Sequence, residues 1–542
     1  MNKPLSKYQS ALRFFEAFIL LALICVGLFA ALKVGLNYDE DAEFRTYLKN
    51  IGAINGLAHG SAIEYQDLTQ YFDRYYGVGF HLLSFSIGAF LHNLVGDLLP
   101  FSQLGSRLMW SHAIIFLTFI GSGILVRSCI LKLTSDKLIS FLGMFAFLFW
   151  PYLFGHGTMN IKDVPFMFAW LCCTFQMIRI FEEAKIKCRF SVWNSVFLGI
   201  FTGWLISIRV SGVLICIQYF WIGVFLLTNT PLENEKNYIK KFLLNVLIIV
   251  GVSAASLFVF FPILWHNPIE IIKAIQYMSS HPWQGNTLTA GQFIEPKTRL
   301  IFYMGAWFLV KLPVFILMGL LLTPIAIWKA LISKKLSIHG QIFIALFLSV
   351  ISTLMTLIIM RVALYNELRQ ILFIFPLLLI ISIAALYVLS KKGTIFVLLV
   401  TVALMVVDGV KLYPYGYTYI NEIARFSHIG RQYETDYYGL SVRETARWLN
   451  NSQIDGSKLC LYVPSLNTWK YEINPGKFPC VGNFPGDLSL IKEPFLFFVH
   501  SRSVTSFHSA PWCRIIHTEL AWLAFMDSPF KMGELYECRP PT

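Results

Sequence analysis

The chain has 542 residues, of which 56% are hydrophobic and 14% are charged, and its mean hydropathy is +0.61. This composition excludes an ordinary soluble enzyme and is typical of a polytopic membrane protein. The formal net charge of +13 does not indicate a nucleic-acid partner, because much of the excess lies in short loops, where lysine and arginine set topology and contact anionic lipid.

Long apolar stretches recur along most of the chain. Crossing the hydrocarbon core takes roughly 17 to 25 apolar residues in a helix. Eleven stretches are candidates: 14–36, 108–131, 138–155, 164–181, 193–208, 212–228, 242–261, 312–328, 341–360, 371–389 and 394–408. The first is too long, and too plainly followed by further spans, to be a cleaved signal peptide. The predicted fold is a polytopic α-helical membrane protein with about 11 transmembrane helices.

Three consecutive carboxylates, Asp39, Glu40 and Asp41, follow the first apolar stretch where the chain emerges from the membrane. Grouped acids at a bilayer boundary carry a cost in repulsion and dehydration, and such costs tend to be retained where a site uses them. The alternative is an acidic loop that simply faces away from the cytoplasm. The apolar segment 78–95 is predicted as a helix in the membrane interface or re-entering it, since a span there would break the pattern of basic loops.

A second acid, Asp163, stands beside Lys162 and is followed at once by Val-Pro and a new apolar helix. This places a carboxylate at a helix N-terminus, where the dipole favours its ionised form, although a simple N-cap gives the same pattern. Arg209 and Arg369 lie at the ends of other spans. Each alone is often a headgroup anchor, but together with Lys162 they are suited to a lipid phosphate.

Basic loops stay on the cytoplasmic side of a membrane. The remaining connections therefore lie outside: 37–107, 156–163, 262–311, 361–370 and everything after Asp408. We divide the chain into a transmembrane domain, 1–408, and an external domain, 409–542. Short apolar runs at 459–463 and 495–499, separated by turn residues, predict a small α/β domain.

Four of the ten cysteines lie in this external part: Cys460, Cys480, Cys513 and Cys538. An even number in an oxidising compartment permits two disulfides, and the spacing leaves three connectivities open. None shows the CxxC spacing of a zinc site.

Several motifs, in this order along the chain, carry a family resemblance. They are the acids after the first span, Asn160-Ile-Lys-Asp-Val-Pro, Ser207-Ile-Arg-Val-Ser-Gly, Tyr303-Met-Gly-Ala-Trp with Lys311-Leu-Pro, Glu367-Leu-Arg with Pro376, Tyr413-Pro-Tyr-Gly-Tyr-Thr-Tyr-Ile-Asn-Glu422 and Tyr433-Glu-Thr-Asp-Tyr-Tyr-Gly-Leu-Ser441. To about residue 450, the chain resembles bacterial dolichyl-phosphate-mannose protein mannosyltransferase-like proteins, glycosyltransferase family thirty-nine of the GT-C superfamily. It departs from them in lacking a MIR-domain counterpart and in having Gln370 where many relatives have histidine.

The resemblance implies a GT-C fold and sugar transfer from a polyprenyl-phosphate donor on the non-cytoplasmic face. It also implies that Asp39 occupies the position of the catalytic acid, that Glu40 completes the acidic pair and that Asp163 is the second acid. The residues fit this chemistry, because an inverting transferase needs a base for the acceptor hydroxyl and cations for the departing phosphate. We expect Asp39 to be the base, and Lys162, Arg209 and Arg369 to bind the phosphate. No cofactor or metal is expected, although the acids are suitable ligands for a divalent ion.

The transferred sugar is expected to be mannose or a similar hexose or pentose, and the acceptor a protein or glycolipid. Aromatic residues in the external loops are candidates for binding it: Tyr65, Tyr71, Tyr75, Tyr76, Trp283 and Tyr303. The expected location is a bacterial inner membrane with the site facing the periplasm, or the ER membrane in a eukaryote. The alternatives are a transporter or flippase of lipid-linked sugars and a non-catalytic scaffold. Transporters usually bury ionisable groups near the midplane, whereas the charges here gather at one surface.

Overall fold

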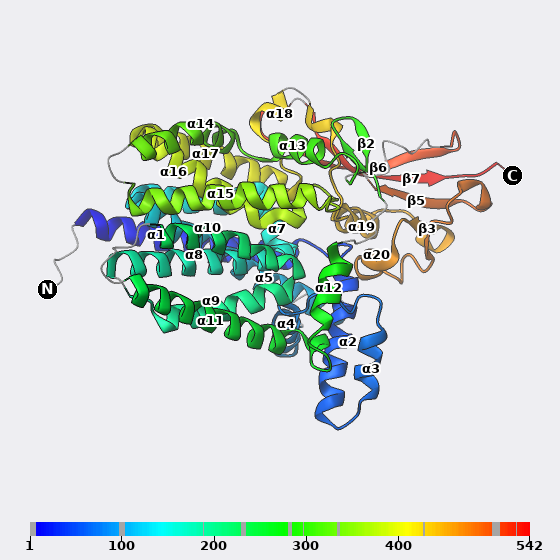
Figure 1. Ribbon diagram of the computed structural model, residues 1–542. Helices are drawn as coiled ribbons and strands as arrows, with labels where there is room; N and C mark the ends of the chain where they lie inside the picture. Colours follow the sequence, from blue (N-terminus) through cyan, green and yellow to red (C-terminus); the bar gives the residue numbers. More distant parts are fainter. Residues whose placement is uncertain are drawn as a thin grey trace.

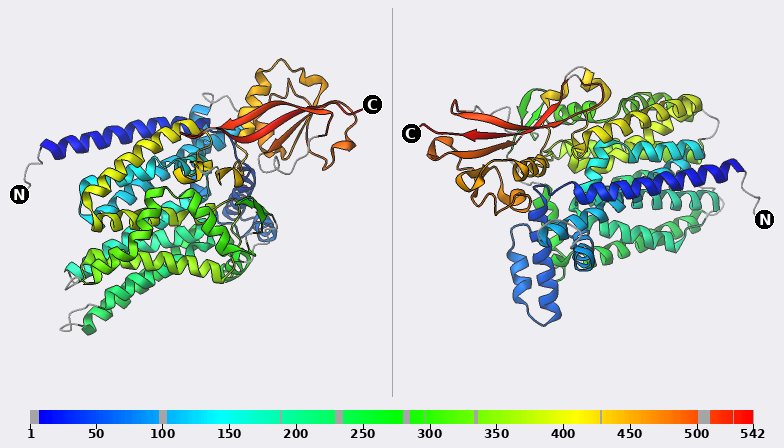
Figure 2. Two further views of the ribbon diagram at one scale, coloured as in Figure 1. Left: turned by 90° about the horizontal axis from the view of Figure 1, so that it is seen from above. Right: turned by 180° about the vertical axis from the view of Figure 1, so that it is seen from behind.

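The computed structural model describes residues 7–96, 103–187, 189–228, 235–279, 285–295, 297–332, 336–426, 429–500, 510–526 and 528–541. Long helices lie side by side in a bundle, and a small domain with a β-sheet extends from one end of it (Figure 1). The N-terminus lies at the opposite end of the bundle (Figure 2). The predicted class, a polytopic helical protein with a small C-terminal α/β domain, is confirmed.

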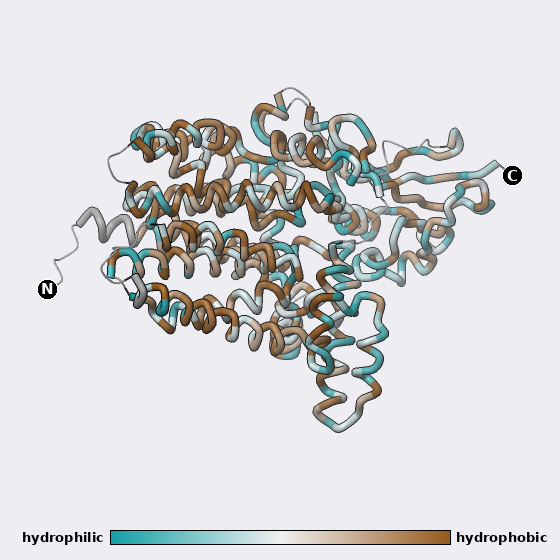
Figure 3. Tube along the Cα trace, viewed as in Figure 1, coloured by the Kyte–Doolittle hydropathy of each residue, from teal (hydrophilic) through white to brown (hydrophobic). Residues whose placement is uncertain are grey.

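Within the described ranges, nine helical segments are long and apolar enough to cross a membrane. They are α1 (Lys7–Lys33), α5 (Gln103–Thr134), α8 (Asp163–Lys187), η2 with α10 (Val210–Leu227), α11 (Glu235–Phe260), α14 (Val314–Ile332), α15 (Ile338–Ile359), η5 with α16 (Arg369–Leu389) and α17 (Lys391–Leu412). Their apolar side chains make the bundle the most hydrophobic part of the molecule (Figure 3). The α16 segment is 89% buried and central, whereas the α11 segment is 11% buried and peripheral.

Two of the eleven predicted stretches differ from a long helix. The stretch 138–155 is divided into α6 (Lys137–Leu148) and α7 (Pro151–Met159), which are bent by 61°. The break is local in origin, because a proline disfavours helical backbone at the residue before it, and Trp150 is indeed extended. The stretch 193–208 forms α9 (Val192–Ile208), which has 17 residues and packs along α8 and α11. By length and composition, nine or ten segments of the described chain, rather than eleven, are long and apolar enough to cross a membrane.

Shorter helices cover the end of the bundle that carries the sheet domain. α2 (Glu40–Ala58) and α3 (Ile63–Gln70) form an antiparallel hairpin that projects sideways, beside α12 (Glu270–Ser279) (Figure 1). α4 (His81–Val95), the segment predicted not to span, has 15 residues and packs against α5 and α2. A hairpin of β1 (Thr287–Thr289) and β2 (Gln292–Ile294) and the helix α13 (Leu300–Lys311) complete this end.

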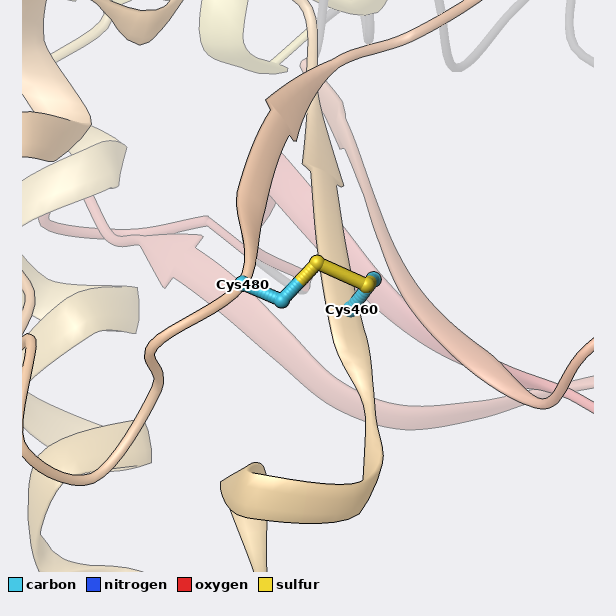
Figure 4. The surroundings of a disulfide bond; sticks show 2 residues. All are labelled: Cys460 and Cys480. Carbon is cyan, nitrogen blue, oxygen red and sulfur yellow. A yellow bond between two sulfur atoms is a disulfide. The ribbon is translucent and has the colours of Figure 1, made fainter.

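The sheet domain has five strands in the order β4-β3-β5-β7-β6. They are β3 (Cys460–Val463), β4 (Val481–Asn483), β5 (Phe495–His500), β6 (Cys513–Ala521) and β7 (Phe530–Cys538). β3 is parallel to β4 and β5, whereas β7 is antiparallel to β5 and β6. α19 (Ser441–Asn451) and α20 (Leu466–Glu472) join the strands in one core. The four predicted cysteines form two disulfides, Cys460–Cys480 (Figure 4) and Cys513–Cys538.

The segment 413–440 precedes this sheet in sequence but packs with the bundle. Tyr417, Tyr419 and Tyr438 are fully buried in the core that the bundle helices share. Asn421 donates to the carbonyl oxygens of Leu309 at 2.6 Å and Leu312 at 2.8 Å, at the end of α13. The segment, which includes α18 (Glu422–Phe426), therefore links the last span to the sheet domain.

Candidate active site

A cavity of about 260 Å³ opens where the connections before α2, α8, η2 and η5 meet at the end of the bundle. Its wall carries seven charged side chains: Asp39, Glu43, Asp73, Lys162, Asp163, Arg209 and Arg369. The wall also includes apolar residues: Leu214, Leu357, Val362 and Leu364. Five of the predicted site residues therefore line one cavity: Asp39, Lys162, Asp163, Arg209 and Arg369.

Asp39 and Arg369 form an ion pair across this cavity. Asp39 immediately precedes α2, and its side chain remains 43% exposed, whereas that of Arg369 is 10% exposed. The Arg369 guanidinium lies 5.2 Å from the ring centroid of Tyr438 and 5.4 Å from that of Tyr365, where aromatic faces attract a cation. Its Nε is buried and finds no hydrogen-bond partner among the described residues. The pair therefore places a partly exposed carboxylate beside a mostly buried guanidinium in the cavity wall.

Asp163 is the first residue of α8, and Asn160 and Arg209 both bind it. Its backbone N–H donates to Asn160 Oδ1 at 2.8 Å, and Asn160 Nδ2 donates to its Oδ2 at 3.0 Å. Arg209, the residue between α9 and η2, donates to Oδ1. Asp163 is buried and both of its carboxylate oxygens are engaged. This geometry suits a residue that orients Arg209 toward the cavity.

Glu43, which is not among the predicted site residues, also lines the cavity. Its carboxylate accepts from Lys162 Nζ at 2.8 Å and bonds His81 Nε2 at 2.9 Å. Burial by itself raises the pKa of Glu43, but Lys162 and His81 outweigh it and lower the pKa to about 2. Lys162 Nζ also lies 4.1 Å from the ring centroid of Tyr76. The sequence does contain a signal for Glu43: it follows Asp39 by four residues, and on a helix this spacing places two side chains on the same face.

The three consecutive acids point in three directions. Glu40 is buried away from the cavity, where its Oε1 lies 2.6 Å from Asn37 Nδ2 and 3.0 Å from His112 Nε2. Asp41 faces the sheet domain, with Oδ1 3.2 Å from Lys470 Nζ. Neighbouring residues on a helix are about 100° apart, so they cannot share one face. The structure does not bring Glu40 to the cavity beside Asp39.

Some of the predicted aromatic residues line the cavity and others lie elsewhere. Tyr75 and Tyr76 line the cavity, and Tyr365 and Tyr438, which were not predicted, line it too. The others have different surroundings: Tyr65 donates to Pro262 O, Tyr71 lies 3.3 Å from Thr46 Oγ1, and Tyr303 donates to Glu367 O. Trp283 lies outside the described residues. In the part of the chain that is described, no group of three or more His, Cys, Asp or Glu side chains is placed to hold a metal ion.

Fold and site together define the class: a polytopic membrane protein with a charged cavity at one end of its bundle. No protein-family model and no curated protein matches the chain. Among solved structures it is similar to ArnT from Cupriavidus metallidurans, in the apo state (11% identity, TM-score 0.44) and bound to undecaprenyl phosphate (13% identity, TM-score 0.44), each over 97% of this chain and 99% of that one. It is also similar to the Archaeoglobus fulgidus oligosaccharyltransferase in the apo form (11% identity, TM-score 0.42), over 88% of this chain and 66% of that one. The likeness is distant, so the roles of the site residues rest on the geometry above.

Proposed function

We propose that the protein is a membrane glycosyltransferase that moves a sugar from a polyprenyl-phosphate donor to an acceptor hydroxyl. The observation that carries the proposal is the Asp39–Arg369 ion pair, a partly exposed carboxylate beside a guanidinium, in the wall of one cavity. A base and a phosphate-binding cation are the two groups that this transfer needs side by side.

In the proposed reaction the acceptor oxygen attacks the anomeric carbon as Asp39 takes its proton. The bond between the anomeric carbon and the phosphate oxygen breaks, and polyprenyl phosphate leaves with the bonding electrons. Attack opposite to the leaving group inverts the anomeric configuration. The phosphate is already a stable leaving group, so the protein has to position it and neutralise its charge. The sugar, a mannose or a similar hexose or pentose, and the acceptor, a protein or glycolipid, remain parts of the proposal.

The phosphate is assigned to Arg369 and Arg209, with Lys162 beside them. Each arginine uses Nη1 to contact a carboxylate, and its remaining N–H groups supply the forked geometry that phosphate oxygens accept. Lys162 contributes charge from its place against Glu43. The apolar lining residues, which include Leu214 and Leu357, are assigned to the first part of the polyprenyl chain. No metal or other cofactor is included in the proposed reaction.

The site is assigned to the non-cytoplasmic side, which in a bacterium is the periplasmic face of the inner membrane. The support is the positive-inside pattern of the loops, together with the position of α2, whose first turns line the cavity, at the end of the bundle away from the start of α1 (Figure 1). The two disulfides belong to the sheet domain at the same end, as expected for an oxidising compartment.

The test uses the purified full chain in liposomes with a polyprenyl-phosphate sugar labelled in the sugar, and measures free polyprenyl phosphate and labelled acceptor. The proposal expects both products from the wild type and neither from Asp39→Asn. The alternative, a transporter or flippase, expects labelled donor to change leaflet without release of polyprenyl phosphate. Movement of intact donor, equal in wild type and Asp39→Asn and without product, would overturn the proposal.

A further inference from the structure

A buried ion pair lies at the end of the last candidate span. Asp408 belongs to α17, about one turn before the helix ends at Leu412, and it is 1% exposed. Arg425 of α18 binds it with two hydrogen bonds, Nη1 to Oδ1 at 2.9 Å and Nη2 to Oδ2 at 2.8 Å. A carboxylate in a membrane span is costly and usually has an identifiable role. Asp408 has no role in the proposed sugar transfer.

The same pair holds the turn between β6 and β7. The backbone N–H of Ala524 donates to Asp408 Oδ1 at 3.0 Å, and Arg425 Nη1 donates to the Ala524 carbonyl oxygen at 3.2 Å. Two hydrogen bonds therefore attach the sheet domain to this pair, one to Asp408 of α17 and one to Arg425, which two further hydrogen bonds join to Asp408. Figure 2 shows these strands running from the C-terminus back to the bundle.

The attached turn presents large apolar side chains to the outside. Leu523 and Ala524 are buried, but Phe525 is 66% exposed and Trp522 is 45% exposed. Phe525 also has a φ of 61°, which is unusual for a bulky residue and indicates that its surroundings impose the conformation.

The neighbouring surfaces are apolar as well. On α18, Ile423 is 59% and Phe426 is 66% exposed. On α17, Val407 and Val410 are exposed on either side of Asp408 in sequence, and on a membrane span such side chains face lipid. Asp408 lies four residues before the end of α17, roughly 6 Å along the helix. Ala524, bonded to Asp408, therefore lies near the C-terminal end of α17, where a helix of this length is expected to leave the hydrocarbon.

We propose that Trp522, Phe525, Ile423 and Phe426 form a lip that inserts into the surface of the lipid bilayer. Its partner is the membrane, because Ala524 and Arg425 are hydrogen-bonded to Asp408 of the span α17, and tryptophan beside phenylalanine suits the interface. The Asp408–Arg425 pair sets the depth of the lip by fixing Ala524 to the helix. The lip anchors the sheet domain to the membrane at a second point besides the chain connection. This inference does not depend on sugar transfer.

The test uses the full chain in liposomes of phosphatidylcholine and phosphatidylglycerol, with a photoreactive side chain introduced as Phe525→p-benzoylphenylalanine. Irradiation is expected to give lipid adducts, detected by mass spectrometry, at a level near that of a lipid-facing control, Val410→p-benzoylphenylalanine. Leu490, a 65% exposed residue of the sheet domain, supplies the aqueous control and should give less than about a tenth of those adducts.

Position 426, on a different element, provides an independent measurement if the Phe525 variant does not fold. Lipid adducts at either Phe525 or Phe426 above the Leu490 level support the proposal. Adducts at the Leu490 level from every folded variant would overturn it. Cross-links to a second copy of the chain instead of lipid would also overturn it, because they would make this surface a protein interface.

Discussion

Lys311 and Glu367 form an ion pair behind the cavity wall, with 2.7 Å between Nζ and Oε1 and both side chains at most 1% exposed. Glu367 and the preceding Asn366 have φ values of 65° and 51°. Asparagine adopts this left-handed conformation readily, but for Glu367 it costs roughly 1 to 3 kcal/mol and persists only where the surroundings enforce it. Arg369 follows two residues later and enters the cavity. The pair thus holds the backbone that presents Arg369 to Asp39.

Removing one partner of this pair should destabilise the protein strongly. Lys311→Met leaves the Glu367 carboxylate buried without its cation, and the free energy of unfolding should fall by about 3 to 5 kcal/mol. The double variant Lys311→Met with Glu367→Gln should recover a large part of the loss, since no charge is left uncompensated. Thermal unfolding in detergent measures both. Lys391→Met is the matched control, because Lys391 is 57% exposed in its pair with Asp136 and should cost about 1 kcal/mol or less.

Asp39→Asn should abolish most of the transfer while the fold and donor binding are retained. Loss of a general base costs roughly 10²-fold or more in turnover. Asp41→Asn is the control, because Asp41 faces Lys470 and not the cavity, and Glu40→Gln should have a milder effect than Asp39→Asn. Initial rates with a polyprenyl-phosphate sugar are the measurement. Near wild-type turnover of folded Asp39→Asn would remove Asp39 from the catalytic role.

Arg209→Lys and Arg369→Lys should weaken use of the donor more than use of the acceptor. Lysine keeps the charge but loses the forked donor geometry, so we expect a rise of roughly tenfold in the donor KM or a comparable loss in kcat. Arg127→Lys is the matched control, since Arg127 pairs with Glu16 and lies outside the cavity wall. Steady-state kinetics, with the donor and acceptor concentrations varied separately, measure the two effects. Unchanged donor kinetics in both variants would identify these arginines as headgroup anchors.

The stabilisation that ionised Glu43 gives to the fold should be lost in acid. Its pKa is lowered from 4.5 to about 2 in the folded protein, so its ionised form stabilises the fold above pH 4.5, and that contribution is lost as the pH falls from 4.5 toward 2. The full contribution is on the order of 3 kcal/mol. Glu43→Gln lacks it, so the difference in melting temperature between wild type and variant should shrink as the pH is lowered through this window. A constant difference would contradict the assignment.

The end of the bundle with the cavity should be reachable from outside the cell. His59, exposed at the end of α2, and Lys392, exposed at the start of α17, lie at ends that the loop charges assign to opposite sides of the membrane. A membrane-impermeant thiol reagent on intact cells should label His59→Cys and spare Lys392→Cys, with labelling of the unsubstituted chain subtracted. Labelling of Lys392→Cys alone would reverse the orientation.

Local sequence determined the elements of this protein. The length of each apolar stretch is set by the thickness of the hydrocarbon core, and most predicted spans therefore correspond to helices. The alternation of turn residues and short apolar runs marked the sheet domain, whose four cysteines form two disulfides. Asp39, Lys162, Asp163, Arg209 and Arg369 were selected because each stands where an apolar helix begins or ends, and all of them line the cavity.

Tertiary structure alone decided which side chains share that cavity. Glu43 pairs with Lys162 across 119 residues of sequence, and Glu40, next to Asp39, turns toward His112. The direction of a helical side chain depends on how its helix is rotated against its neighbours, and that rotation is fixed by packing between distant segments. The same packing placed 413–440 in the core of the bundle. Sequence by itself thus determined which charged groups stand at the membrane boundary, and only the fold decided which of them meet.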